Sequence, residues 1–309
     1  MAKENNLNPY SKMKILIEKE LNDIGLDCDT RSKLLKEIPS RWEKLGDMVL
    51  VPELSFYSII WDEINLKFEN RIWKIICGVL NVSKVGKQMK ISKGRLRKSQ
   101  VRLLFGEDGI VLHKENGVFF EFDTTKVMFS SGNVSERIRV SKFNCNGEII
   151  LDLYSGIGYY SIPILVYSNP KSLHACEINP DSIIEFKKNL KHNNVHEKCT
   201  LHEGDNNLTV PKANIFGKVN RVILGLLPSS EKGWHLAIKS LTPNGGMLHL
   251  HGNAEAKKED LWAEEVIFKL EKISRDLSCN YQFKLIHIEK VKSYAPRVNH
   301  IVLDILVIN

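Results

Sequence analysis

Two carboxylates and two glycines stand at spacings that suit a nucleoside-binding site. An apolar run from Ile149 ends at Asp152, and Gly156 and Gly158 follow before a helical pattern begins. Glycine lets a tight strand-to-helix turn (the glycine turn, residues 153–158) bring its backbone close to a ligand. Glu177 ends the next apolar run, 19 residues after Gly158, where a carboxylate can accept hydrogen bonds from both hydroxyls of a ribose. The spacing predicts a nucleoside-cofactor cradle, although an ordinary strand-to-helix turn would also explain the glycines.

Asp205 and Asn206 follow the third apolar run, directly after Gly204. In a parallel sheet the side chains after successive strands gather at one edge, where ligands bind. We therefore expect Asp205 and Asn206 to bind the exocyclic amine and ring edge of an adenine, with a plain polar turn as the alternative.

The fourth apolar run ends in the substrate loop, residues 225–229, which reads Gly225, Leu226, Leu227, Pro228 and Ser229. Enzymes that methylate an amine often place Asn or Asp at its first position. Neither glycine nor leucine has a side chain that can accept a hydrogen bond from an amine. The loop thus argues against simple amine methylation and favours a carbon nucleophile that needs positioning. We read the serine as a helix cap, because no His or Lys at a recognisable spacing activates it, and we assign no catalytic base.

A polar connector, residues 126–147, precedes the glycine turn. At its centre lies the lid segment, residues 130–133, which begins with Ser130 and is followed by Arg137. Its hydroxyls, amide and flexible backbone could close over a cofactor. A linker with a helix cap is the alternative.

Positive charge is concentrated in the basic stretch, residues 84–102, which holds eight lysines and arginines and no acidic residue. The whole chain carries a net charge of only +7. The positive charges of such a cluster repel one another unless a polyanion such as nucleic acid neutralises them. A solvated basic loop is also common. The candidate nucleic-acid contacts are Lys93, Arg95, Arg97 and Lys98.

From residue 148 onward strand and helix patterns alternate, which predicts a parallel sheet covered on both faces. Strands are expected at 148–153, 172–177, 200–203, 221–225 and 246–251, and helices at 158–167, 180–193, 231–241 and 255–277. Two further strands, 283–292 and 300–307, have no helix between them and should pair antiparallel at the edge. This ending typifies S-adenosylmethionine-dependent transferases with a Rossmann-like α/β fold.

The chain of 309 residues is long enough for more than one domain. We expect a helical extension over 1–39, a small α+β domain over 40–125 with one helix at 61–80, and a Rossmann-like catalytic domain over 126–309. The sequence has neither an apolar run that could span a bilayer nor a secretory signal, so we expect a cytoplasmic protein without membrane contact. The scattered cysteines and the pair His249 and His251 do not predict a metal site.

Four segments carry a family resemblance: residues 38–47, 122–133, 152–159 and 224–234. They resemble the tRNA wybutosine-synthesising protein 2 family over roughly residues 38–308. The last segment discriminates best, because the related tRNA guanine-37 N1-methyltransferases usually carry Asn-Leu-Pro there.

The resemblance implies transfer of the 3-amino-3-carboxypropyl group of S-adenosylmethionine to a carbon of 4-demethylwyosine at position 37 of phenylalanine tRNA, with 5′-methylthioadenosine as leaving group. It also implies that Ser130 and Arg137 touch the cofactor, that Glu177 takes the ribose, and that Asp205 and Asn206 take the adenine. At position 137 we associate the family with lysine. Arginine differs from lysine but keeps the positive charge. We expect a monomer.

Two other functions stay open from the sequence. One is a tRNA guanine-37 N1-methyltransferase of the same fold. The other is a tRNA-binding protein without catalysis, against which the intact glycine turn and Glu177 argue.

Overall fold

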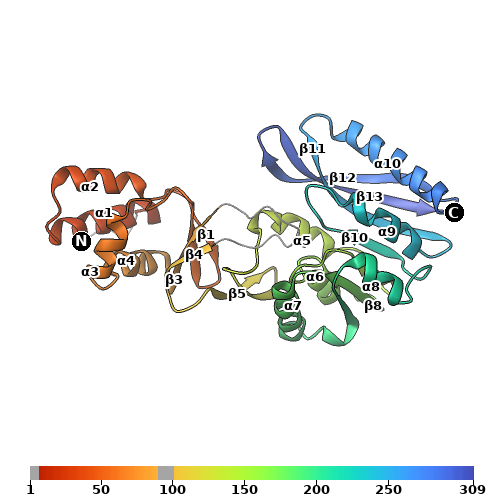
Figure 1. Ribbon diagram of the computed structural model, residues 1–309, viewed down its shortest axis with the longest axis horizontal. Coiled ribbons are helices and arrows are strands. Elements are labelled where there is room, and N and C mark those ends of the chain that lie inside the picture. The colour runs from red at the N-terminus through yellow and green to blue at the C-terminus, as the bar shows by residue number, and fades with distance from the viewer. Residues whose placement is uncertain (1–6, 90–100) are drawn as a thin grey trace. The chain divides into compact units, whose positions relative to one another are not determined.

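The computed structural model describes residues 7–89 and 101–309. The chain divides into an N-terminal unit, Met1–Lys114 with Phe120–Phe129, and a C-terminal unit, Glu115–Phe119 with Ser130–Asn309 (Figure 1). The boundaries expected at residues 39 and 125 stay predictions. Within the described ranges, no helix combines the length and apolar character that crossing a membrane requires.

The N-terminal unit packs helices against a small mixed sheet. Its helices are α1 (Pro9–Asp23), α2 (Cys28–Leu34), α3 (Ile60–Lys67) and α4 (Arg71–Leu80), with a 3-10 turn η2 (Leu35–Glu37). Its strands are β1 (Glu43–Leu45), β2 (Met48–Val51), β3 (Lys84–Gln88) and β4 (Val101–Phe105), in the order β1-β2-β3-β4. The pairing of β2 with β3 is parallel, and the others are antiparallel. Strands β5 (Ile110–Glu115) and β6 (Val118–Asp123) form a separate two-stranded sheet.

The first helices belong to the core of this unit. Met13 and Ile17 of α1 are buried in one cluster with Trp61 and Ile76. Asn8 starts α1 by accepting a hydrogen bond from the Ser11 amide. The prediction of one helix over 61–80 was wrong: α3 ends at Lys67 and α4 begins at Arg71, because residues 69 and 70 have left-handed backbone conformations.

The C-terminal unit is built on a seven-stranded sheet, ordered β12-β13-β11-β10-β7-β8-β9. Its strands are β7 (Ile149–Asp152), β8 (Ser172–Glu177), β9 (Cys199–Glu203), β10 (Arg221–Leu224), β11 (Gly245–Glu255), β12 (Gln282–Ala295) and β13 (Val298–Ile308). Its helices are α5 (Val134–Val140), α6 (Ser161–Tyr167), α7 (Pro180–His192), α8 (Asn206–Lys212), α9 (Trp234–Ser240) and α10 (Glu259–Asp276), with 3-10 turns η3 (Ser131–Asn133), η4 (His196–Lys198) and η5 (Glu231–Gly233).

Strands β7 to β11 are parallel, and β13 pairs antiparallel with both β11 and β12. The expected parallel sheet with an antiparallel pair at its edge is confirmed. One face is covered by α8, α9 and α10, whose apolar side chains join Leu151, Leu248 and Leu303 in a single core. Figure 1 shows α10 lying along this antiparallel part of the sheet.

Strands β11, β12 and β13 run on past the point where β10 ends. Leu224, the last residue of β10, pairs with Leu250, but β11 continues to Glu255. In this extension Asn253 pairs with His300, which in turn pairs with Lys292. The sequence predicted these strands too short, because a polar end such as residues 252–255 does not look like a strand until its antiparallel partners are known.

Candidate active site

The glycine turn lies directly over a buried carboxylate. Asp152, the last residue of β7, is fully buried; it accepts hydrogen bonds from the Ser161 hydroxyl at 2.7 Å and from the Tyr154 amide at 3.1 Å. Burial raises the pKa of Asp152 to about 6. The carboxylate therefore fixes the start of the turn from beneath.

Both glycines of the turn are required by its geometry. Gly156 has φ +57° and Gly158 has φ +96°. A Cβ at Gly158 would lie 2.6 Å from side-chain atoms of Ile162 and Phe186, closer than packed atoms allow. Any side chain at Gly158 would therefore collide with its neighbours, and the positive φ at both positions favours glycine.

Glu177 joins the ends of two neighbouring strands. Its carboxylate accepts hydrogen bonds from the Gly156 amide at 2.7 Å, the Ile178 amide at 2.9 Å and the Asn179 amide at 2.7 Å. Burial raises its pKa, while these amides act in the opposite direction. Three of roughly four lone-pair positions of the carboxylate are used, so about one direct position is left for a ligand hydroxyl.

Asp205 and Asn206 occupy the start of α8, a helix that the sequence did not predict. Asp205 caps it by accepting a hydrogen bond from the Asn207 amide at 3.0 Å. Asn206 is buried, and its Nδ2 donates to the Leu153 carbonyl at 3.0 Å. The structure therefore brings Asn206 to the glycine turn. Capping of α8 is by itself enough to explain why residue 205 is an aspartate.

Two positive side chains hold the lid segment at its first residue. Arg137 is buried and forms a two-point ion pair with Glu115, Nε to Oε1 at 2.5 Å and Nη2 to Oε2 at 2.7 Å. Its Nη1 donates to the Ser130 carbonyl at 3.0 Å. Lys292 donates from Nζ to the Ser130 hydroxyl at 2.6 Å. Sequence reasoning missed Lys292, since no spacing or motif links it to a serine 162 residues earlier.

The substrate loop is anchored at both ends. A Cβ at Gly225 would lie 2.9 Å from Cε2 of the Tyr160 ring, so glycine is needed where the loop begins. The Pro228 carbonyl accepts from the Asn253 amide at 2.9 Å, and the Leu227–Pro228 peptide is cis. The Ser229 hydroxyl accepts from the Glu231 amide at 3.2 Å, as in a helix cap. Pro228 and Ser229 are exposed.

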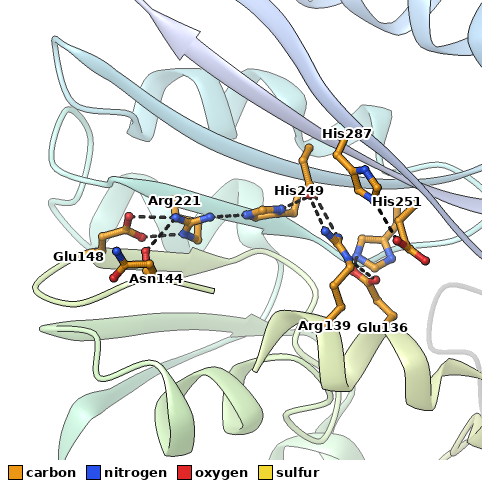
Figure 2. A network of polar contacts seen from close by, with 10 residues as sticks. Glu136, Arg139, Asn144, Glu148, Arg221, His249, His251 and His287 are labelled. Atoms are coloured by element: carbon orange, nitrogen blue, oxygen red, sulfur yellow. Dashed lines mark hydrogen bonds and ion pairs between the residues drawn. The ribbon is translucent and has the colours of Figure 1, made fainter. Parts of the chain in front are cut away.

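A largely buried polar network connects the start of β10 with α5 and with strands β11 and β13 (Figure 2). Figure 2 shows the Arg221 guanidinium between Glu148 and His249, and Arg139 and Glu136 reaching the sheet from α5. Asp304 completes it by accepting from Arg139. His251, which the sequence paired with His249, instead contacts His300 with its Nδ1 3.1 Å from Nε2. No group of three or more His, Cys, Asp and Glu side chains is arranged to hold a metal ion in the part of the chain that the structure describes.

The candidate tRNA contacts Lys93, Arg95, Arg97 and Lys98 lie outside the described residues. The structure does describe both ends of the basic stretch, and the charged side chains there have partners within the N-terminal unit. Lys84 lies 2.8 Å from Asp108, and Arg102 lies 2.9 Å from Asp62. Lys87 is buried and donates to the Phe56 carbonyl at 2.9 Å. The stretch is thus less uniformly available to a polyanion than its composition indicates.

Comparison with known proteins gives the family. A family model described as the TRM5/TYW2 methyltransferase domain matches residues 111–282, and one described as the TYW2 N-terminal domain matches residues 25–109. The chain belongs to the TRM5/TYW2 family. The resemblance found in four sequence segments is confirmed, and so is the predicted fold class, that of S-adenosylmethionine-dependent transferases.

Members of the TRM5/TYW2 family differ in how much of their length this chain matches. It is 40% identical to "tRNA wybutosine-synthesizing protein 2/3/4" of Arabidopsis thaliana, over 98% of this chain but only 29% of that protein. It is 36% identical to the Danio rerio "tRNA wybutosine-synthesizing protein 2 homolog", over 87% of this chain and 72% of that protein. The structure of Pyrococcus horikoshii TYW2 in complex with MeSAdo matches with a TM-score of 0.74 at 27% identity, over 96% of this chain and 99% of that one.

Proposed function

We propose that this chain transfers the 3-amino-3-carboxypropyl group of S-adenosylmethionine to a carbon of 4-demethylwyosine at position 37 of phenylalanine tRNA, releasing 5′-methylthioadenosine. A carbon–carbon bond forms, the carbon–sulfur bond breaks with its electron pair going to sulfur, and the base carbon loses a proton. The names of the relatives support the pathway. The MeSAdo complex of the Pyrococcus relative supports the leaving group.

The C-terminal unit has features that fit S-adenosylmethionine. The glycine turn has positive φ at both glycines, as the tight strand-to-helix turn of a nucleoside cradle requires. Glu177 keeps an acceptor position at the end of the neighbouring strand. When bound, this group donor supplies a carbon made electrophilic by a positively charged sulfur. The protein's task is then to bind, orient and exclude water.

The residue roles follow the strand ends. We assign Gly156 and Gly158 to close backbone approach and Asp152 to support of the turn from below. Glu177 takes a ribose hydroxyl, and Asp205 and Asn206 take the adenine. Ser130 in the lid segment and Arg137 after it touch the cofactor.

The substrate loop carries the choice between carbon and amine acceptors. Gly225, Leu226 and Leu227 put no hydrogen-bonding side chain at the end of β10, where an amine would need an acceptor. Tyr160 fills the space beside Gly225, so the loop presents apolar surface and the exposed Pro228 and Ser229. Such a surface positions a planar base and offers no strong base for an amine proton.

Two labelled forms of the group donor test the reaction. One carries the label in the methyl carbon and the other in the aminocarboxypropyl carbons. We expect only the second label to reach tRNA that contains 4-demethylwyosine. Label arriving only from the methyl group would identify a methyltransferase instead, and failure of the protein to bind S-adenosylmethionine would favour a tRNA-binding protein without catalysis.

For tRNA we propose that the segment with Lys93, Arg95, Arg97 and Lys98 contacts phosphates, with 40–125 as the tRNA-facing domain, 1–39 as a helical extension and 126–309 as the catalytic domain. Neutralising the four side chains should weaken tRNA binding and flatten its dependence on salt. Lys258 and Lys269, which are exposed and ion-paired with Glu255 and Glu231, provide the control. Loss of thermal stability alone would make the stretch structural. We propose that the protein acts as a monomer in the cytoplasm.

A further inference from the structure

Two cationic donors converge on Ser130. Arg137 donates to its carbonyl at 3.0 Å, and Lys292 donates to its hydroxyl at 2.6 Å. The carbon chain of Lys292 also lies against Gly132, where an added Cβ would come 3.1 Å from the lysine Cδ. The Ser130 hydroxyl accepts from Lys292, so its own hydrogen can be donated to another acceptor.

Lys292 lies on the side of the sheet formed by the carboxyl ends of the parallel strands, where ligands bind in this fold. It pairs with His300, and His300 pairs with Asn253, beyond the residue at which β10 ends. The amide of Asn253 donates to the carbonyl of Pro228 in the substrate loop at 2.9 Å. The ammonium of Lys292 and the substrate loop are therefore attached to the same row of residues across β11, β13 and β12.

The lid segment also contains an acceptor with no donor. Asn133 Oδ1 is buried and has no hydrogen-bond partner among the described residues. A buried acceptor without a donor is costly, so such atoms usually await a ligand or water. Donors at Ser130 and an acceptor at Asn133, three residues apart, together suit a group that carries a carboxylate and an ammonium.

We propose that Lys292 and Ser130 bind the carboxylate of the amino-acid arm of S-adenosylmethionine, and that Asn133 accepts a hydrogen bond from its ammonium. The inference rests on the proposed function. It assigns Lys292 a role in holding the amino-acid arm of S-adenosylmethionine rather than its methyl group. A carboxylate held by an ammonium and a hydroxyl restricts rotation of the arm that is to be transferred, which lowers the cost of orienting it.

Decarboxylated S-adenosylmethionine, which lacks only the carboxylate, isolates this contact. Binding of both compounds is measured by titration calorimetry for the wild type, Lys292→Met and Lys292→Arg. Methionine keeps the carbon chain against Gly132 and removes the charge. Lys290→Met is the matched control, because Lys290 lies on the same strand, pairs with Ile301 and is exposed.

We expect Lys292→Met to weaken binding of S-adenosylmethionine about 10- to 100-fold, the range for a hydrogen bond to a charged group. Binding of the decarboxylated compound should not weaken, Lys292→Arg should recover part of the loss, and Lys290→Met should change neither. A thermal melt confirms that each variant is folded.

Other outcomes overturn the inference. Equal weakening for both compounds would make Lys292 a support of the lid segment. Unchanged binding of both, with weaker and less salt-dependent tRNA binding, would assign its charge to a phosphate of the tRNA. If the wild type bound neither compound, the proposed function itself would fail, which is a different result from any of these.

Discussion

Nη1 of Arg221 lies 2.6 Å from Nε2 of His249. A guanidinium can only donate, so Nε2 must accept, and the imidazole proton is on Nδ1. Nδ1 lies 2.6 Å from Oδ1 of Asp304 and donates to it. Burial lowers the pKa of His249, in agreement with a neutral ring. One histidine thereby joins β10, β11 and β13, the strands on which the substrate loop and the partner of Lys292 depend.

Asp304→Asn should destabilise the C-terminal unit strongly. Asp304 accepts hydrogen bonds from Arg139 and His249 and is nearly buried. An asparagine at this position would place its NH₂ group against one of these two donors. It would also leave the positive charge of Arg139 without this carboxylate partner. We expect the free energy of unfolding to fall by about 3–5 kcal/mol, measured by urea denaturation. Glu255→Gln is the control, because its ion pair with Lys258 is exposed and should matter by less than about 1 kcal/mol. Equal losses in the two variants would contradict the role of burial.

His300 should make stability depend on pH. Burial, and after it the charge of Lys292, lower its pKa to about 4. The unfolded chain therefore takes up this proton first as the pH falls below about 6.5, and stability decreases by up to about 1.4 kcal/mol per pH unit. Asp152, with its pKa raised to about 6, acts in the opposite direction at lower pH. The comparison of wild type with His300→Gln between pH 7 and 5 isolates the histidine. Parallel curves for the two proteins would show that His300 does not titrate as described.

Glu177→Ala should weaken binding of S-adenosylmethionine by about 1–3 kcal/mol, because a ribose hydroxyl loses a charged acceptor. The melting temperature should fall too, since three backbone amides lose the same acceptor. Glu203→Ala is a close control: Glu203 pairs with Glu177 across the ladder but is exposed. An unchanged dissociation constant in Glu177→Ala would remove the ribose assignment.

Gly225→Ala should impair transfer more than cofactor binding. Its methyl group would lie 2.9 Å from Cε2 and 3.1 Å from Cδ2 of Tyr160, so the ring or the substrate loop must shift, at a cost of about 1–3 kcal/mol. Gly78→Ala is the control, because Gly78 lies inside α4 with nothing within 4 Å. That change should stabilise the protein by about 0.5–1 kcal/mol. Wild-type turnover in Gly225→Ala would show that the loop does not need its glycine.

The sequence predicted the part of the site that depends on neighbours in the chain. A glycine turn after a buried strand, and a carboxylate at the next strand end, are local patterns with one common geometry, and Asp152, Gly158 and Glu177 lie as that geometry requires. The antiparallel ending was predictable for the same reason, because no helix separates the last two strands.

The rest depends on contacts between distant segments. Helices α5 and α8 have seven residues each, too few for apolar periodicity to identify them. Lys292 reaches Ser130 only because β11, β12 and β13 extend beyond β10. The position of Asn206 depends on the Leu153 carbonyl of another strand end. None of these contacts leaves a signal in local spacing.

Mass spectrometry of the position-37 nucleoside in phenylalanine tRNA tests the central claim most directly. Cells that lack this protein should accumulate 4-demethylwyosine, and adding the purified protein with S-adenosylmethionine to that tRNA should convert it to the aminocarboxypropyl product with release of 5′-methylthioadenosine. Normal wybutosine in the cells that lack it, or a product carrying one added methyl group, would contradict the account.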